Sequence, residues 1–279
     1  MIYQDILSNG HATRAVNQCF KLIAEPHDAG ATNLFLPDGL LSVLYLAKGS
    51  FSIKTAAGKV VHKAPKILLA FFVQSQEVVF SADMIVYGQT FYPWIINKLG
   101  MPGRELQNRL EPIEMINRAG EGLYEKLAMV NNETQIPALV QRAIFNQEEI
   151  LLPSPLTTYM QKVVASNGHL KISAVLPELN MSERHFQQKF LNSFGITPKY
   201  YIDLCKFNYS KALLEKERQM SLSAIAQWSG YCDQSHFIRN FKKFSGRSPK
   251  VLRKEDIGMG KYFGMYQNRG DGIFDDVVK

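Results

Sequence analysis

The chain of 279 residues is 46% hydrophobic and 20% charged, which excludes a disordered chain, a collagen-like repeat and a small disulfide-stabilised scaffold. Its longest uninterrupted apolar run, from Ile67 to Val73, is far shorter than the ~20 residues of a membrane-spanning helix. Asp5 interrupts the first apolar stretch and no basic residue precedes it, which argues against a secretory signal. We expect a cytoplasmic protein of about two domains that does not associate with membranes.

The net charge of +7 is concentrated in one segment. Residues 1–152 carry 13 Lys+Arg against 14 Asp+Glu, residues 255–279 carry 3 against 5, and residues 153–254 carry 16 against 6. A basic segment between near-neutral ones is typical of a module that neutralises nucleic-acid phosphates and releases their counterions. A solvated basic face would carry the same charge, so charge alone leaves both interpretations open.

Residues 33–92 have the pattern of β structure. Short apolar runs alternate with turn signals such as Pro37-Asp38-Gly39 and Lys48-Gly49, a spacing typical of a sandwich or small barrel. The strands are predicted at residues 40–46, 51–55, 60–61, 67–73 and 78–80.

From Trp94 the apolar spacing becomes helical, with predicted helices within residues 95–99, 106–113, 116–127 and 139–144. Pro153-Ser154-Pro155 then removes two amide donors and disfavours helix, which marks a domain boundary. The predicted fold class is α+β. We expect a β-rich domain with following helices over residues 1–152, an all-helical domain over 153–254 and a flexible tail over 255–279.

One pattern occurs twice in the basic segment with the same internal spacing. The first copy runs from His185 to Pro198 and the second from His236 to Pro249, and each reads His-Phe-x3-Phe-x4-Gly-x-[Thr/Ser]-Pro. Phenylalanines at i and i+4 lie on one helix face, and the Gly and Pro that follow end the helix. Ser182 and Asp233 precede the two helices as N-cap candidates.

A shorter apolar helix precedes each copy, so each unit reads as helix, tight turn and capped second helix. This is a helix-turn-helix, with units predicted at about residues 172–195 and 222–246, whose second helix fits the DNA major groove. With the phenylalanines in the core, the helical wheel leaves an outward set of DNA-binding candidates. In the first unit these are Arg184, Gln187 and Gln188, and in the second they are Gln234, Ser235, Ile238, Arg239 and Lys242.

The chemistry of this outward set suits DNA. Arg reads guanine, Gln reads adenine, Ile packs on a thymine methyl group, and Lys with the capped helix ends holds phosphate. Between the units, residues 198–216 are predicted to form one helix of roughly 28 Å. Adjacent major grooves on one face of a duplex are about 34 Å apart, so one chain could place both units on double-stranded DNA. Helical hairpins with solvated polar faces are the alternative.

The segment from Ser221 to Pro249, SLSAIAQWSGYCDQSHFIRNFKKFSGRSP, closely resembles the signature of the AraC/XylS family of bacterial transcription regulators. With the first unit, the resemblance covers about residues 156–254. It implies two helix-turn-helix units joined by a long helix, sequence-specific promoter binding and activation through contact with RNA polymerase. At matching positions, the outward residues named above would face the bases.

Three residues depart from the family pattern. Leu176 replaces a small alanine in the first scaffold helix, and Pro177 after it removes one helical hydrogen bond unless the helix begins late. The first unit is therefore expected at an altered angle or with a smaller part in specificity. Lys206 replaces an arginine of the connecting helix, which keeps the charge but loses the planar fork that supports an ion pair.

The N-terminal part resembles, more loosely, the sensory domains of such regulators, through its order of elements and the stretch from Gly88 to Pro93. In the family this region binds a small-molecule effector, forms a homodimer, or both. Aromatic residues of this part are candidates to line a pocket, although core packing is the stronger interpretation. They are Phe71, Phe72, Tyr87, Phe91, Tyr92 and Trp94.

Enzyme signatures are missing from the sequence, which has no Gly-x-Ser-x-Gly elbow, no Walker loop and no close ligand spacing among His11, His27 and His62. We expect no catalytic residue, metal or cofactor. The cysteines, Cys19 among them, form no Cys-x-x-Cys pair and are interpreted as buried reduced thiols.

Two alternatives remain. One is a DNA-tethered enzyme, for which Cys19 is the candidate nucleophile outside the DNA-binding helices, and the other is a regulator controlled by a protein partner.

Overall fold

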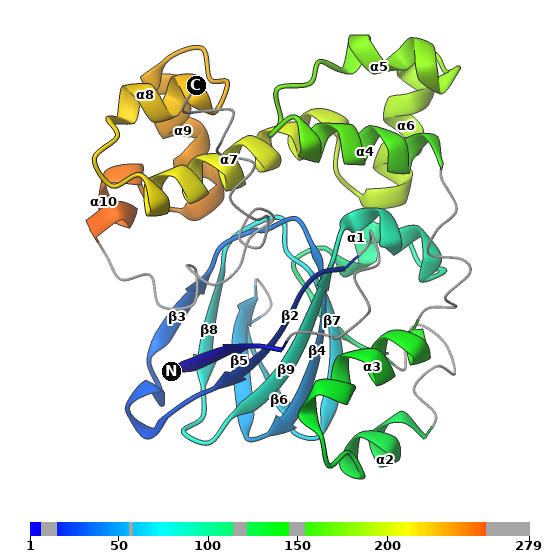
Figure 1. Ribbon diagram of the computed structural model, residues 1–279, viewed down its shortest axis with the longest axis vertical. Coiled ribbons are helices and arrows are strands. Elements are labelled where there is room, and N and C mark those ends of the chain that lie inside the picture. The colour runs from blue at the N-terminus through cyan, green and yellow to red at the C-terminus, as the bar shows by residue number, and fades with distance from the viewer. Residues whose placement is uncertain (7–15, 56–57, 114–121, 145–153, 255–279) are drawn as a thin grey trace.

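The computed structural model describes residues 1–6, 16–55, 58–113, 122–144 and 154–254. An antiparallel β-sandwich with attached helices forms the N-terminal part, and an all-helical domain follows it (Figure 1). The expected α+β fold class is thus confirmed. Among the described residues, no helix is long and apolar enough to span a membrane.

Two antiparallel sheets make the sandwich. The six-stranded sheet has the order β1 (Ile2–Asp5), β2 (Val16–Ile23), β9 (Ile85–Phe91), β4 (Leu41–Lys48), β7 (Lys66–Phe71) and β10 (Leu110–Pro112). The four-stranded sheet has the order β3 (Thr32–Phe35), β8 (Gln76–Phe80), β5 (Ser50–Thr55) and β6 (Gly58–Lys63). The strands predicted between residues 40 and 80 are all found, but β1 and β2 precede the predicted β region.

The helical prediction for residues 106–113 is wrong. Helix α1 (Gly103–Leu106) stops after four residues, and Asn108 takes a positive φ of 53°. The side-chain oxygen of Asn108 accepts the backbone N–H groups of Val73 (3.1 Å) and Gln74 (2.9 Å), which ties this turn to the end of β7. The chain therefore leaves the turn as β10, antiparallel to β7. Leu106 and Leu110, whose i, i+4 spacing suggested one helix, lie in different elements on either side of the turn.

Successive side chains of a strand point to opposite faces of the sheet, so the apolar residues form two separate hydrophobic cores. The residues between the sheets form one cluster, which includes Phe20, Leu22, Leu46, Leu68, Phe80 and Val86. The opposite face of the six-stranded sheet carries Val43, Tyr45, Leu69, Phe71, Tyr87 and Phe91 and belongs to a second cluster. This second cluster continues through the helices into the core of the C-terminal domain, so the two parts pack against each other.

Short helices cover that second face and lead to the C-terminal domain (Figure 1). They are η2 (Pro93–Lys98), α1, α2 (Leu123–Ala128), η5 (Glu133–Gln135) and α3 (Ile136–Ile144), while η1 (Pro26–Asp28) follows β2. The C-terminal domain contains α4 (Pro155–Ala165), α5 (Ile172–Leu179), α6 (Glu183–Phe194), α7 (Pro198–Lys216), α8 (Leu222–Trp228), α9 (Gln234–Ser245) and α10 (Pro249–Lys254). Pro153 of the expected boundary, the expected helix start at residue 116 and the tail 255–279 lie outside the described residues.

Candidate DNA-binding surface and apolar cavity

The first helix-turn-helix consists of α5 and α6. Asn180 ends α5 in the left-handed conformation, with φ of 54°. The Ser182 hydroxyl caps α6 by accepting the backbone N–H of His185 at 3.4 Å, and Gly195 ends it with φ of 71°. Phe186 and Phe190 of α6 are fully buried, as the repeat predicted, and so is Phe194, which the repeat does not specify.

The second unit repeats this construction in α8 and α9. Gly230 makes the turn with φ of 69°, and the Asp233 carboxylate accepts the backbone N–H of His236 at 2.7 Å. Gly246 ends α9 with φ of 73°. Both predicted N-caps and both predicted helix stops are therefore confirmed, and Phe237 and Phe241 are buried.

Helix α7 connects the units and has the predicted bounds, 19 residues from Pro198 to Lys216 (Figure 1). Lys206, at the position of the family arginine, donates from Nζ to the Gly230 carbonyl at 2.6 Å and lies 5.8 Å from the Tyr231 ring centroid. Burial lowers the pKa of this ammonium group. Lys206 thus fixes the turn of the second unit through a carbonyl and a ring.

Helix α5 carries the feature that distinguishes the first unit. The helix begins at Ile172, so it does not begin late, and Pro177 lies inside it. A proline there leaves the Ser173 carbonyl without its helical N–H donor. Leu176 is half-buried against the core, and the cap of α6 is nevertheless intact. The missing bond is therefore a local defect of the scaffold helix.

The predicted DNA-binding candidates are solvent accessible on α6 and α9. Ile238 is half-buried and packs against the core, and the rest are exposed: Arg184, Gln187, Gln188, Gln234, Ser235, Arg239 and Lys242. The side-chain amide of Gln187 donates to Glu183 Oε1 and that of Gln188 to Asn192 Oδ1, each at 2.9 Å. These amides are occupied along the helix, and contact with a base edge would exchange those partners.

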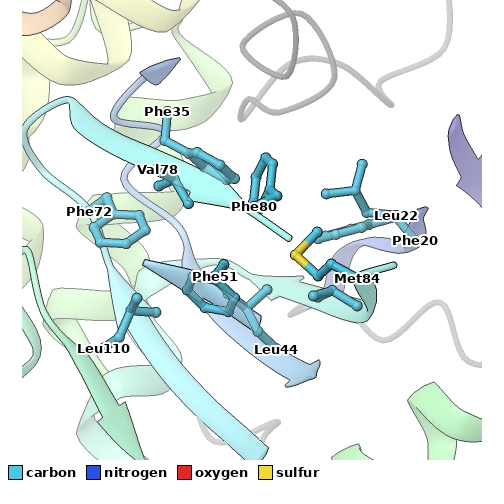
Figure 2. Close-up of a pocket in the computed structure, with 11 residues that line it drawn as sticks. Phe20, Leu22, Phe35, Leu44, Phe51, Phe72, Val78, Phe80, Met84 and Leu110 are labelled. Atoms are coloured by element: carbon cyan, nitrogen blue, oxygen red, sulfur yellow. The ribbon is translucent and has the colours of Figure 1, made fainter. Parts of the chain in front are cut away.

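An apolar cavity lies between the two sheets (Figure 2). Its volume is about 30 Å³, and every lining side chain is apolar. The lining residues are Phe20, Leu22, Phe35, Leu44, Phe51, Phe72, Val78, Phe80, Met84, Val86 and Leu110.

Of the aromatic candidates, Phe72 lines this cavity. Phe71, Tyr87, Phe91 and Trp94 belong to the other core cluster, and Tyr92 packs against that cluster, its ring stacked on Trp94 with 4.5 Å between centroids. Core packing was thus the right interpretation for these five.

Cys232 and His27 differ from what the sequence predicted for the cysteines and histidines. Cys19 and Cys205 are buried free thiols as expected, but Cys232 is exposed because it lies in the turn before α9. His27 does approach carboxylates, since its ligand atoms and those of Glu25 and Asp28 lie within 4.8 Å of one another. The amino group of Met1 forms ion pairs with both carboxylates, at 3.0 Å from Glu25 and 2.7 Å from Asp28.

Sequence reasoning missed the residues that join the two domains. The Tyr200 hydroxyl donates to the Val73 carbonyl at 2.8 Å, and the Asn208 amide donates to the Pro37 carbonyl at 3.1 Å. The one available signal was Asn208 itself, a polar residue among the apolar positions of the predicted connecting helix. Its partners are about 170 residues distant, so no local pattern identifies them.

The fold and the exposed helix faces define a DNA-binding domain with two helix-turn-helix units joined by one long helix. A family model described as "Helix-turn-helix domain" matches residues 177–255. Over this domain the chain is similar to the AraC/XylS-type transcription regulators, whose members bind DNA.

Individual relatives match only part of this chain. The Msm operon regulatory protein of Streptococcus mutans is 29% identical over 98 residues, which cover 34% of this chain and 35% of that protein. The arabinose operon regulatory protein of Salmonella typhimurium is 26% identical over 140 residues, 48% of each chain. The chain thus spans about half, or less, of the length of these curated relatives. Among solved structures, ToxT from Vibrio cholerae O395 aligns over 86% of this chain and 98% of that chain, with 15% identity and a TM-score of 0.49.

Proposed function

We propose that the chain is a sequence-specific transcription regulator, an activator acting in the cytoplasm, that reads two adjacent major-groove segments of promoter DNA. The observation that carries this proposal is the pair of capped recognition helices on either end of α7. At 1.5 Å per residue, α7 is roughly 28 Å long, close to the ~34 Å between successive major grooves on one duplex face.

Specific base contacts follow from the exposed side chains of α6 and α9. Arg239 suits guanine, Gln187 and Gln188 suit adenine, and the half-buried Ile238 offers a methyl group to thymine. Lys242 is placed one turn further along α9, where it suits a phosphate. Arg184, Gln234 and Ser235 occupy the N-terminal turns of their helices, the part that enters the groove first in this motif.

We assign residues 1–152 to a sensory domain, 153–254 to the DNA-binding domain and 255–279 to a tail. The cavity supports a small, apolar effector, because a polar ligand would lose its hydrogen bonds to water there. Its volume of about 30 Å³ is far below the roughly 150 Å³ of an apolar cavity that accepts benzene, so such a ligand would have to displace side chains from the wall. RNA polymerase and a second copy of the chain are the further partners proposed from the family.

Selection of fragments from a random DNA library tests this function. The full-length protein is incubated with the library, and bound fragments are sequenced after washes at increasing salt. We expect a motif with two blocks about 10 bp apart. Fragments enriched without any common motif, and lost uniformly as salt rises, would mean phosphate binding alone and would contradict the proposal.

A further inference from the structure

Three places in the N-terminal domain hold the DNA-binding domain by hydrogen bonds. The Val73 carbonyl, just after β7, accepts the Tyr200 hydroxyl at 2.8 Å. The carbonyls of Pro37 and Asp38, just before β4, accept the Asn208 amide at 3.1 and 3.3 Å. The third place is Gln107, whose side-chain amide donates to the carbonyl of Phe194 at the end of α6, at 3.0 Å. The first two hold α7, and the third holds a recognition helix.

Each of these places adjoins a residue of the cavity wall. Phe72 precedes Val73, Phe35 lies two residues before Pro37, and Leu110 lies three residues after Gln107. In Figure 2, Phe72 and Leu110 lie at one end of the cavity, with Phe20, Leu22 and Met84 at the other. The wall and the domain contacts therefore share short stretches of backbone.

The backbone around Phe72 connects these places with one another. The Phe72 carbonyl accepts the Gly39 N–H at 3.3 Å, and Gly39 follows the Asp38 that holds Asn208. The Val73 N–H donates to Asn108 Oδ1 at 3.1 Å, and Asn108 follows Gln107. A displacement of the Phe72 backbone thus reaches the Val73 contact directly along the chain and the other two contacts through one hydrogen bond each.

We propose that Phe72 is the positioning residue that transmits occupancy of the apolar cavity to helix α7 and the recognition helices. This inference rests on the proposed effector function of the cavity. A ligand that enters so small a space must move wall side chains, and close packing makes a ring the size of Phe72 carry its backbone with it. The bonds of Gly39 and Tyr200 would then weaken, which frees α7 to change the placement of the two units.

Phe80 supplies a matched control. It lines the same cavity and is buried to a similar degree, with 4% of its surface exposed against 7% for Phe72. Its backbone belongs to β8, which pairs on both sides within the four-stranded sheet. Phe72→Leu and Phe80→Leu therefore remove the same atoms from the wall of one cavity. Only Phe72 lies next to the hydrogen bonds that join the two domains.

Hydrogen exchange by mass spectrometry on the full chain tests the proposal without DNA or ligand. Phe72→Leu is expected to accelerate exchange in residues 38–40 and 72–74 about tenfold or more, the effect of weakening one or two hydrogen bonds. Phe80→Leu is expected to change exchange there less than about twofold, after correction for global stability. Equal acceleration by the two variants, or none by Phe72→Leu, would overturn the proposal.

Benzene is the apolar probe for the second arm. In the unsubstituted chain, benzene is expected to raise the melting temperature and to accelerate exchange in residues 38–40 and 72–74. In Phe72→Leu it is expected to raise the melting temperature with no further acceleration. Stabilisation of the unsubstituted chain without faster exchange refutes transmission through Phe72 and leaves the effector cavity standing. Absence of any stabilisation refutes the cavity as an apolar site, while the first arm still decides the role of Phe72.

Discussion

Replacement of Arg239 by alanine is expected to remove base preference at one position of the DNA site. Arg239 is exposed on α9, and the ion pairs found among the described residues do not include it. The substitution should therefore change the free energy of unfolding by less than about 0.5 kcal/mol. A bidentate contact with guanine accounts for ~1 to 3 kcal/mol of discrimination, so binding to the preferred site should weaken roughly 5- to 150-fold.

Lys242→Ala is the matched control, since this lysine is also exposed on α9 and is assigned to a phosphate. It should weaken binding to all sequences similarly and reduce the slope of log K against log salt by about one. Fluorescence anisotropy titrations with the preferred site and its single-base variants, at several salt concentrations, separate the two effects. If Arg239→Ala kept the full preference at every position, the assignment of the base-reading face of α9 would be wrong.

Three further substitutions have defined outcomes. Burial raises the pKa of Asp38 to about 7, so the folded state holds a proton that the unfolded chain releases near pH 4. The free energy of unfolding, measured in urea, should therefore fall by roughly 4 kcal/mol between about pH 4 and pH 7. Asp38→Asn should abolish that slope, and an unchanged slope would mean that another group causes it. Asp233→Ala should lower the unfolding free energy by about 1 kcal/mol through loss of the α9 cap, with Asp233→Asn close to the unsubstituted chain. Pro177→Ala should restore a helical bond in α5 and raise the melting temperature; a lower melting temperature would show that the proline suits this turn.

The C-terminal domain could be predicted closely because its signals are local. In each unit the N-cap residue, the buried phenylalanines and the glycine that ends the helix lie within about fifteen residues of sequence. Helix α7 begins at a proline, and its helical pattern can be recognised without any distant partner. The outward faces of α6 and α9 follow from the helical period alone, so the exposure of every candidate residue except the half-buried Ile238 was predictable as well.

The N-terminal domain was predicted less well because sheet pairing is a long-range property. Strand β2 mixes polar and apolar residues and is ordered by β9, with Cys19 opposite Gln89, so no local pattern marks it. Over residues 106–113, the spacing of Leu106 and Leu110 fits a helix and a strand equally, and the Asn108 turn decides between them. The contacts of Tyr200 and Asn208 with the sandwich depend on how two finished domains meet.

Both helix-turn-helix units of one chain are proposed to read bases. The most direct test of this proposal is to repeat the library selection with two variants, Gln187→Ala/Gln188→Ala on α6 and Arg239→Ala on α9. We expect each variant to lose sequence information in a different block of the motif, with the two blocks about 10 bp apart. Loss of the same block in both variants, or an unchanged motif in the α6 variant, would contradict the claim that the first unit reads DNA.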